Sequence, residues 1–124
     1  MKRQKVQGSV EFALVASVLF LFFFVILDGG RLIYTYQTVA EAAREGAHQA
    51  EIVESTDANI RSAITGHSGL LGDLGSTATI SPTPTRTAKS NVTVTVTYQW
   101  RPVTPMLNQF GPINFSASTV VVAE

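Results

Sequence analysis

The chain has 124 residues, of which 45% are hydrophobic and 15% charged, and its formal net charge at pH 7 is zero. This length predicts one domain, and the lack of a basic patch beyond the N-terminus argues against a nucleic-acid-binding protein. Because the sequence contains no cysteine, disulfides, thiolate metal sites and a cysteine nucleophile are excluded.

The N-terminal segment combines a basic start with a long apolar run. Lys2, Arg3 and Lys5 precede residues 12–27, FALVASVLFLFFFVIL, which carry no charge. The positive-inside rule predicts that the N-terminus stays in the cytoplasm and that the C-terminal part crosses the membrane. A simple secretory signal is disfavoured, because Glu11 interrupts the start of the run and no A-x-A cleavage site follows it. A plain membrane anchor and a pilin-type N-terminal helix remain as interpretations.

Glu11 is the feature on which these two interpretations differ. An ionisable residue within a membrane segment is costly and usually has a function. In a plain anchor, Glu11 lies at the interface and faces water. In a pilin-type helix, which leaves the membrane to become the core of a filament, it takes part in assembly.

Helical periodicity continues beyond the apolar run. Small and apolar residues recur at spacings of three and four from Leu32 through Tyr36 to Ala50, and Thr38 falls on the opposite, polar face. A single helix over residues 6–54, roughly 70 Å long, is predicted. Its weak point is Gly29–Gly30, which indicates a kink or a close helix–helix approach. The alanine-rich stripe above it packs against the chain's own head or against neighbouring copies.

A second, shorter helix is predicted over residues 58–67, with Ser55 or Asp57 as its N-cap and Gly66 or Gly69 at its end. Beyond it the periodicity changes from that of a helix to that of strands.

Residues 91–101, NVTVTVTYQWR, alternate strictly between apolar residues and threonine, which is the strongest strand signal in the chain. Further strands are predicted from residue 78 and over residues 113–123. The proline-rich connections 81–90 and 101–112 are expected to be exposed loops.

These elements predict an α+β fold, in which a long N-terminal transmembrane or filament-core helix carries a small antiparallel β-sheet head. Residues 1–54 form the basic leader and the helix, and residues 55–124 form the head.

The sequence contains no P-loop, nucleophile elbow or other catalytic motif, so no enzyme and no cofactor are expected. His48 and His67 lack the spacing of metal ligands. Glu41, Glu45 and His48 share one helical face, but a solvated face is the usual outcome, and no metal is expected.

Asn91 begins an N-x-[ST] triplet and is a candidate glycosylation site.

Three segments together suggest a family. VEFALV (10–15), GGRLIYTYQ (29–37) and AAREGAHQA (42–50), in this order around the apolar run, resemble TadE-like proteins of the tight-adherence (Tad) branch of type IV pili. The resemblance implies a pilin-like subunit that waits in the inner membrane and then polymerises into an extracellular filament for adhesion. It implies other copies, a prepilin peptidase and the pilus assembly machinery as partners. The expected assembly residues are Glu11, Phe12, Leu19, Phe22, Phe23 and Leu27.

The resemblance also implies cleavage after a glycine by a membrane aspartic peptidase, which leaves a glutamate at the fifth mature position. Glu11 matches that glutamate, but Gly8 lies only three residues before it, whereas the rule places the cut at Val6. Gly8 and Ser9 are the candidate cleavage residues. In the family, the glutamate pairs with the N-terminal ammonium of a neighbouring subunit.

Two other functions remain as alternatives. A non-polymerising, membrane-anchored component of the pilus assembly machinery would carry the same residues. A membrane-tethered enzyme or binding domain is disfavoured by the missing catalytic constellation.

Overall fold

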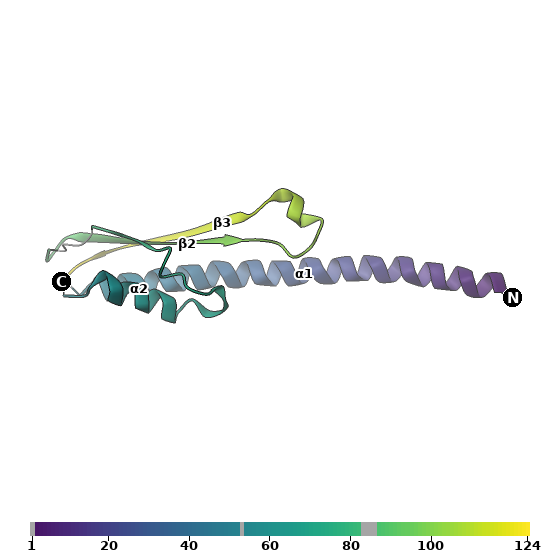
Figure 1. Cartoon of the computed structure of the whole chain (residues 1–124), viewed down its shortest axis with the longest axis horizontal. Coiled ribbons are helices and arrows are strands. Elements are labelled where there is room, and N and C mark those ends of the chain that lie inside the picture. The colour runs from purple at the N-terminus through teal and green to yellow at the C-terminus, as the bar shows by residue number, and fades with distance from the viewer. Residues whose placement is uncertain (1, 53, 83–86) are drawn as a thin grey trace.

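The computed structural model describes residues 2–52, 54–82 and 87–124, as one long helix with a small head at its C-terminal end (Figure 1). The expected loop at residues 81–90 lies partly outside these ranges. The principal elements are α1 (Lys2–Ala50), α2 (Asp57–Gly66), β1 (Thr79–Ser81), β2 (Asn91–Trp100) and β3 (Ile113–Val122). Two short 3-10 helices are η1 (Gly69–Leu71) and η2 (Leu107–Phe110). The predicted α+β class is confirmed.

Helix α1 is one unbroken element of 49 residues, about 70 Å long at 1.5 Å per residue. It passes through Gly29 and Gly30 without interruption, and apart from the adjoining helix backbone and chain neighbours no atom lies within 4 Å of where a Cβ would stand at either glycine. The glycine pair therefore neither breaks the helix nor meets another part of the chain. The helix ends at Ala50 rather than at the expected residue 54, because a turn follows in which Ser55 N–H donates to the Ile52 carbonyl at 2.9 Å.

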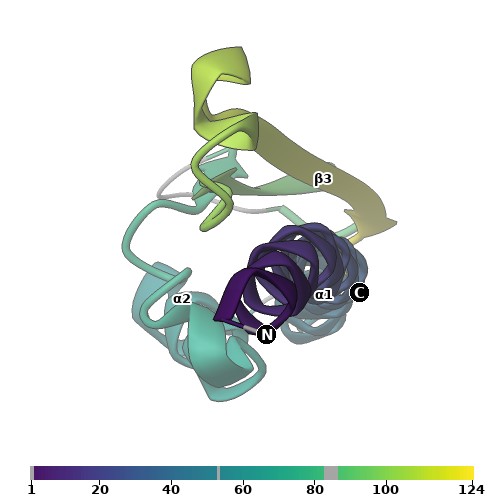
Figure 2. The ribbon, with the colours of Figure 1, turned by 90° about the vertical axis from the view of Figure 1, so that its right-hand side faces the viewer.

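The head packs on the C-terminal half of α1 from two sides. Viewed from the N-terminal end, α2 and the sheet flank α1 (Figure 2). Helix α1 supplies one wall of the head's core, because several of its residues belong to the buried cluster. Burial of an isoleucine or valine side chain in this core contributes about 1.5–3 kcal/mol to stability. The residues of this core that are at most 1% exposed are Val39, Ala42, Ala43, Ala47, Ala50, Ile60, Ile64, Val92, Val94, Val96 and Ala123.

The buried face of α1 differs from the predicted stripe. Thr38, expected on the polar face, is buried, and Tyr36, expected within the stripe, is 64% exposed. The expected stripe follows hydrophobicity, whereas the observed face follows the small residues that let α2 and the sheet approach. Thr35 is also buried, and its hydroxyl donates to the carbonyl of Arg31 at 2.8 Å, so its burial leaves no polar group unsatisfied.

The three strands form one antiparallel sheet in the order β1-β2-β3. The alternation predicted for β2 is confirmed, since Val92, Val94 and Val96 are fully buried and face the helices. Strand β3 pairs along the whole of β2, from Asn91 opposite Val122 to Trp100 opposite Ile113. This register brings the loop between the two strands, residues 101–112, to the end of the head nearest the apolar run.

The N-cap of α2 is Thr56, and neither Ser55 nor Asp57 takes that position. The Thr56 hydroxyl oxygen accepts from the backbone N–H of Asn59 at 3.3 Å, the usual N-cap geometry. The helix ends at Gly66, one of the two predicted residues. In the segment that follows, the Asp73 carboxylate accepts hydrogen bonds from the Thr65 hydroxyl at 2.7 Å and from the Ser76 N–H at 3.2 Å. These hydrogen bonds connect the segment to α2, and they lower the pKa of Asp73.

A tyrosine on α1 attaches the segment after α2 to the helix. The Leu70 N–H donates to the Tyr34 hydroxyl at 3.1 Å. Gly69 precedes it with φ +53, and a Cβ at this residue would collide with the same hydroxyl. Glycine at this position is therefore required both by the backbone and by the close approach of Tyr34.

We predict that Gly46→Ala destabilises the head. A Cβ at Gly46 would lie 2.5 Å from Cγ1 of Ile64 and 3.2 Å from Cγ1 of Val94. Overpacking of this kind typically lowers the free energy of unfolding by about 1–3 kcal/mol, which outweighs the gain of up to about 1 kcal/mol in helix propensity. Denaturant unfolding of the full chain in detergent micelles, followed by circular dichroism, measures the change.

Gly30→Ala is the matched control, because it lies in the same helix with open space around it. Its unfolding free energy should stay unchanged or rise by up to about 1 kcal/mol. Equal stability of the two variants would contradict the close packing at Gly46.

Candidate assembly surface and the Asp28 anchor

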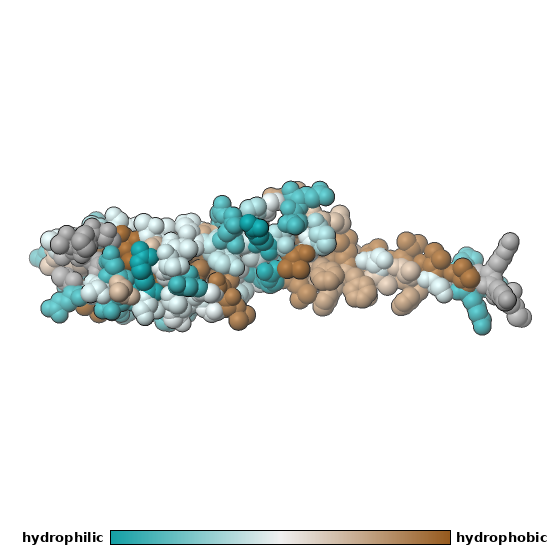
Figure 3. Space-filling view, in the orientation of Figure 1, coloured by the Kyte–Doolittle hydropathy of each residue, from teal (hydrophilic) through white to brown (hydrophobic). Residues whose placement is uncertain are grey.

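The N-terminal half of α1 presents an apolar surface that the chain itself does not cover. Figure 3 shows this surface beyond the head. The most apolar window of the helix, long enough to cross a membrane, has no residue buried. The predicted assembly residues Phe12, Leu19, Phe22, Phe23 and Leu27 all lie on this surface, with exposures from 47% at Leu27 to 74% at Phe12.

This apolar surface extends around the whole circumference of the helix. Every side chain from Val18 to Leu27 is at least 39% exposed, and ten consecutive residues cover more than two helical turns. A helix that is hydrophobic all round is a membrane span or a core element of a larger assembly. The surface therefore requires lipid or protein around it, which identifies the chain as a membrane-associated protein.

Glu11 lies at the N-terminal edge of this surface. It is exposed, and no ion pair in the described part of the chain involves it. Gly8 and Ser9 are helical and exposed, and the Ser9 hydroxyl donates to the carbonyl of Lys5 at 2.9 Å. The segment is accessible, and cleavage near it stays a prediction.

Asp28 lies at the opposite end of the apolar run and is only 2% exposed. Its Oδ1 accepts from the Val103 N–H at 3.0 Å, and its Oδ2 accepts from the Thr104 N–H at 2.8 Å and from the Thr104 hydroxyl at 2.6 Å. Arg31 Nη1 lies 3.2 Å from Oδ1. These contacts fill the roughly four acceptor sites of a carboxylate. The buried charge is thus fully compensated, and it ties the 101–112 loop to α1.

Arg31 and Trp100 complete the anchor. The guanidinium carbon of Arg31 lies 5.9 Å from the centroid of the Trp100 ring, a cation–π distance. Arg31 therefore joins the end of β2 to the same turn of α1 that carries Asp28. Trp100 is buried, and its Nε1 has no hydrogen-bond partner among the described residues.

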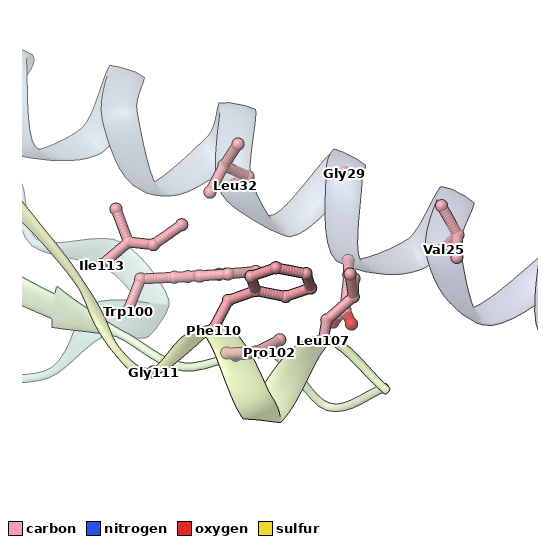
Figure 4. Close-up of a pocket in the computed structure, with 10 residues that line it drawn as sticks. Val25, Gly29, Leu32, Trp100, Pro102, Leu107, Phe110, Gly111 and Ile113 are labelled. Carbon is pink, nitrogen blue, oxygen red and sulfur yellow. The ribbon is translucent and has the colours of Figure 1, made fainter. Parts of the chain in front are cut away.

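An open pocket of about 330 Å³ lies between α1 and the 101–112 loop. Figure 4 shows Val25, Gly29 and Leu32 on the helix side, and Leu107 and Phe110 of η2 on the loop side. Apart from Asp28, the lining is apolar or aromatic. The pocket carries no set of polar groups arranged for catalysis.

Asp28 is a residue of this site that the sequence analysis did not single out. The signal was present, because a carboxylate directly after an uncharged run is as costly as one before it. What the sequence did not contain was its partner. Thr104 is 76 residues away, in a loop with no recognisable motif.

The other predicted candidates lie apart from this site. Asn91 is exposed at the start of β2, so its side chain is accessible, and glycosylation stays a prediction. His48 lies 3.2 Å from Glu51 in an exposed pair at the far end of α1. Within the described ranges, no three histidine, aspartate or glutamate side chains, the Glu41–Glu45–His48 face included, are grouped closely enough to hold a metal ion.

A membrane-capable helix with an open apolar half and a small α+β head is the arrangement that the resemblance to pilin-like proteins predicts. Residues 7–48 match the family model described as TadE-like protein, which confirms the predicted resemblance over that segment. The matched segment contains Glu11, Asp28, Arg31 and Tyr34. No curated protein and no solved structure gave a match.

We predict that Asp28→Asn loosens the 101–112 loop. The amide retains one acceptor oxygen but turns an NH₂ group toward donors, and hydrogen bonds to a charged acceptor contribute about 1.5–3 kcal/mol each. Amide hydrogen exchange at Val103 and Thr104 should accelerate by roughly tenfold or more. Arg31→Gln is the control, since it removes a half-exposed ion pair, worth about 0–1 kcal/mol, and the contact with the Trp100 ring, but leaves the hydrogen bonds from Val103 and Thr104 to Asp28 in place. Unchanged exchange in Asp28→Asn would contradict the anchor.

Proposed function

We propose that this chain is a structural subunit that polymerises through its N-terminal helix into an extracellular Tad-type pilus supporting surface adhesion. The observation that carries the proposal is the apolar half of α1, which is exposed on every side while the rest of the same helix is built into the head. Lipid covers this surface before assembly. Identical helices from neighbouring subunits cover it afterwards, when the head faces outward.

The two acidic residues that bound the apolar run support an assembly role, because they differ in their partners. Asp28 receives all its compensation from its own chain, through Val103, Thr104 and Arg31. Glu11 is exposed, with no ion pair in the described ranges. A carboxylate moved from the membrane interface into a helix bundle needs a cation or must be protonated. Glu11 is therefore the group suited to pair with a neighbouring subunit.

The partner of Glu11 depends on processing. If the leader is removed near Gly8 and Ser9 by a prepilin peptidase, the new N-terminal ammonium of a neighbouring subunit takes this role. If the leader stays, a neighbour's Lys5, Arg3 or Lys2 takes it. The intact mass of the chain purified from fibres distinguishes these two cases directly.

The experiment that tests the proposal is to shear fibres from cells that express the chain and to identify their main component by mass spectrometry. The expected result is that this chain forms the main band and has left the inner membrane. Its complete retention in the inner membrane, with normal fibres built from another protein, would overturn polymerisation. That result would favour the non-polymerising assembly component instead.

We predict that the double variant Phe22→Ala/Phe23→Ala is inserted in the membrane but assembles poorly. Alanine keeps the segment apolar enough to span, whereas removing two exposed rings leaves voids in a helix bundle, at about 3–5 kcal/mol per buried phenylalanine. Fibre yield should fall by at least tenfold at an unchanged level in the membrane fraction, measured by immunoblotting. Normal fibre yield would show that these rings make no subunit contacts.

We predict that Glu11→Gln lowers fibre yield, because glutamine removes the charge that pairs with a neighbouring cation. Quantitative immunoblotting of sheared fibres measures the effect. Glu45→Gln, at a half-exposed position of the same helix within the head, is the control and should assemble normally. Equal yields from the two variants would remove Glu11 from the assembly mechanism.

A further inference from the structure

The 101–112 loop is unusual for an exposed loop because three of its exposed side chains are large and apolar, beside the exposed polar residues Asn108 and Gln109. Val103 and Met106 are each 63% exposed and Phe110 is 82% exposed. The loop contains no acidic residue, and its only charged residue is Arg101 at the start. Three large exposed apolar side chains within the eight residues 103–110 point to a surface that meets another apolar phase.

The loop also lies at a defined level along α1. It is the part of the head that reaches furthest toward the N-terminal end of the helix (Figure 1). Its hydrogen bonds hold it to Asp28, and Leu107 lines a pocket with Val25, one turn inside the apolar run. Counted from Phe12, the roughly 20 residues that cross about 30 Å of hydrocarbon end at Arg31. The loop therefore stands beside the helix where the outer boundary of a bilayer falls.

We propose that the 101–112 loop is a membrane-contacting collar, which seats Val103, Met106 and Phe110 in the interfacial region of the outer leaflet beside α1. The proposal rests on membrane insertion of α1 and not on polymerisation. Arg101 then lies beside lipid phosphates. The Asp28 carboxylate, which would be costly next to acyl chains, is shielded from them by the loop that supplies its hydrogen bonds.

The distribution of residue types along the head favours lipid as the occupant. Trp100, Tyr34 and Tyr36 lie at the membrane-proximal end, and amphipathic aromatic side chains are enriched at bilayer interfaces. The opposite end of the head carries the exposed charged residues Glu51, Glu54, Lys89 and Glu124, beside the exposed apolar residues Ile52 and Val122. The acidic residues lie at the end away from the apolar run, and the 101–112 loop, where acidic side chains would be costly beside acyl chains, has none.

The absence of cysteine from the sequence allows a direct test. Phe110→Cys in the full chain is spin-labelled and reconstituted in phosphatidylcholine vesicles at a large excess of lipid, so that copies rarely meet. Collision rates with oxygen and with a water-soluble nickel chelate are then measured by electron paramagnetic resonance. Phe20→Cys serves as the reference within the membrane, and Ile52→Cys as the exposed reference at the far end of the head.

The proposal expects the label at residue 110 to collide with the nickel chelate several-fold less often than the label at residue 52, and with oxygen more often. Val103→Cys, which leaves Phe110 intact, should give the same pattern. The single tryptophan, Trp100, reports on the unlabelled chain, and its fluorescence should be quenched by phospholipids brominated near the glycerol end of the acyl chain.

Two results would overturn the collar. One is nickel accessibility at residues 110 and 103 equal to that at residue 52, with no quenching of Trp100. The other is protection that appears only when copies are crowded in the bilayer or assembled in fibres, because a second copy and not lipid would then cover the loop. Neither result bears on whether the chain polymerises, since the measurement is made on dispersed subunits.

Discussion

The constraint on which this structure depends is that a single rigid helix must satisfy two different surroundings. Its C-terminal half is one wall of a small protein core, and its N-terminal half has no cover from its own chain. The two halves are continuous, so the head cannot be moved independently of the apolar segment. A head of this size buries little apolar area by itself, and the small residues of α1, with Gly46 among them, allow the close packing that stabilises it.

Asp28 lies where these two halves of the helix meet, and it holds the 101–112 loop of the head against α1. A charged group at the boundary between water and hydrocarbon is unfavourable unless groups of the same protein satisfy its hydrogen bonds. Val103, Thr104 and Arg31 are all part of the same chain, so the compensation of Asp28 is the same whether lipid, water or protein lies outside. The junction can therefore leave the bilayer without exposing an unpaired charge. Glu11, at the other end, has no ion pair among the described residues, and in the proposed assembly its environment would change.

Local patterns were sufficient to predict much of the fold. The continuous helix, the alternation of Val92, Val94 and Val96, and the end of α2 at Gly66 each follow from short-range periodicity or propensity. The expected N-caps of α2 and the expected place of Thr38 on the polar face were wrong, because each depends on tertiary packing that propensity does not contain. The Asp28 anchor could not be predicted for the same reason, since its partner is distant in sequence and belongs to a loop without a motif.

The predicted assembly residues also divide into what local sequence determines and what it does not. Phe12, Leu19, Phe22, Phe23 and Leu27 could be identified as an exposed apolar surface, because hydrophobicity alone determines it. Which of them contact one another in a filament depends on how neighbouring subunits are placed, and a single chain does not contain this information.

The most direct test of the account is an electron cryomicroscopy reconstruction of the sheared fibres. The account predicts that residues 12–27 of every subunit lie in the axial core, packed against the same segment of neighbouring copies, with the sheet on the outside. Fibres in which this segment lies at the periphery, or from which this chain is missing, would contradict it.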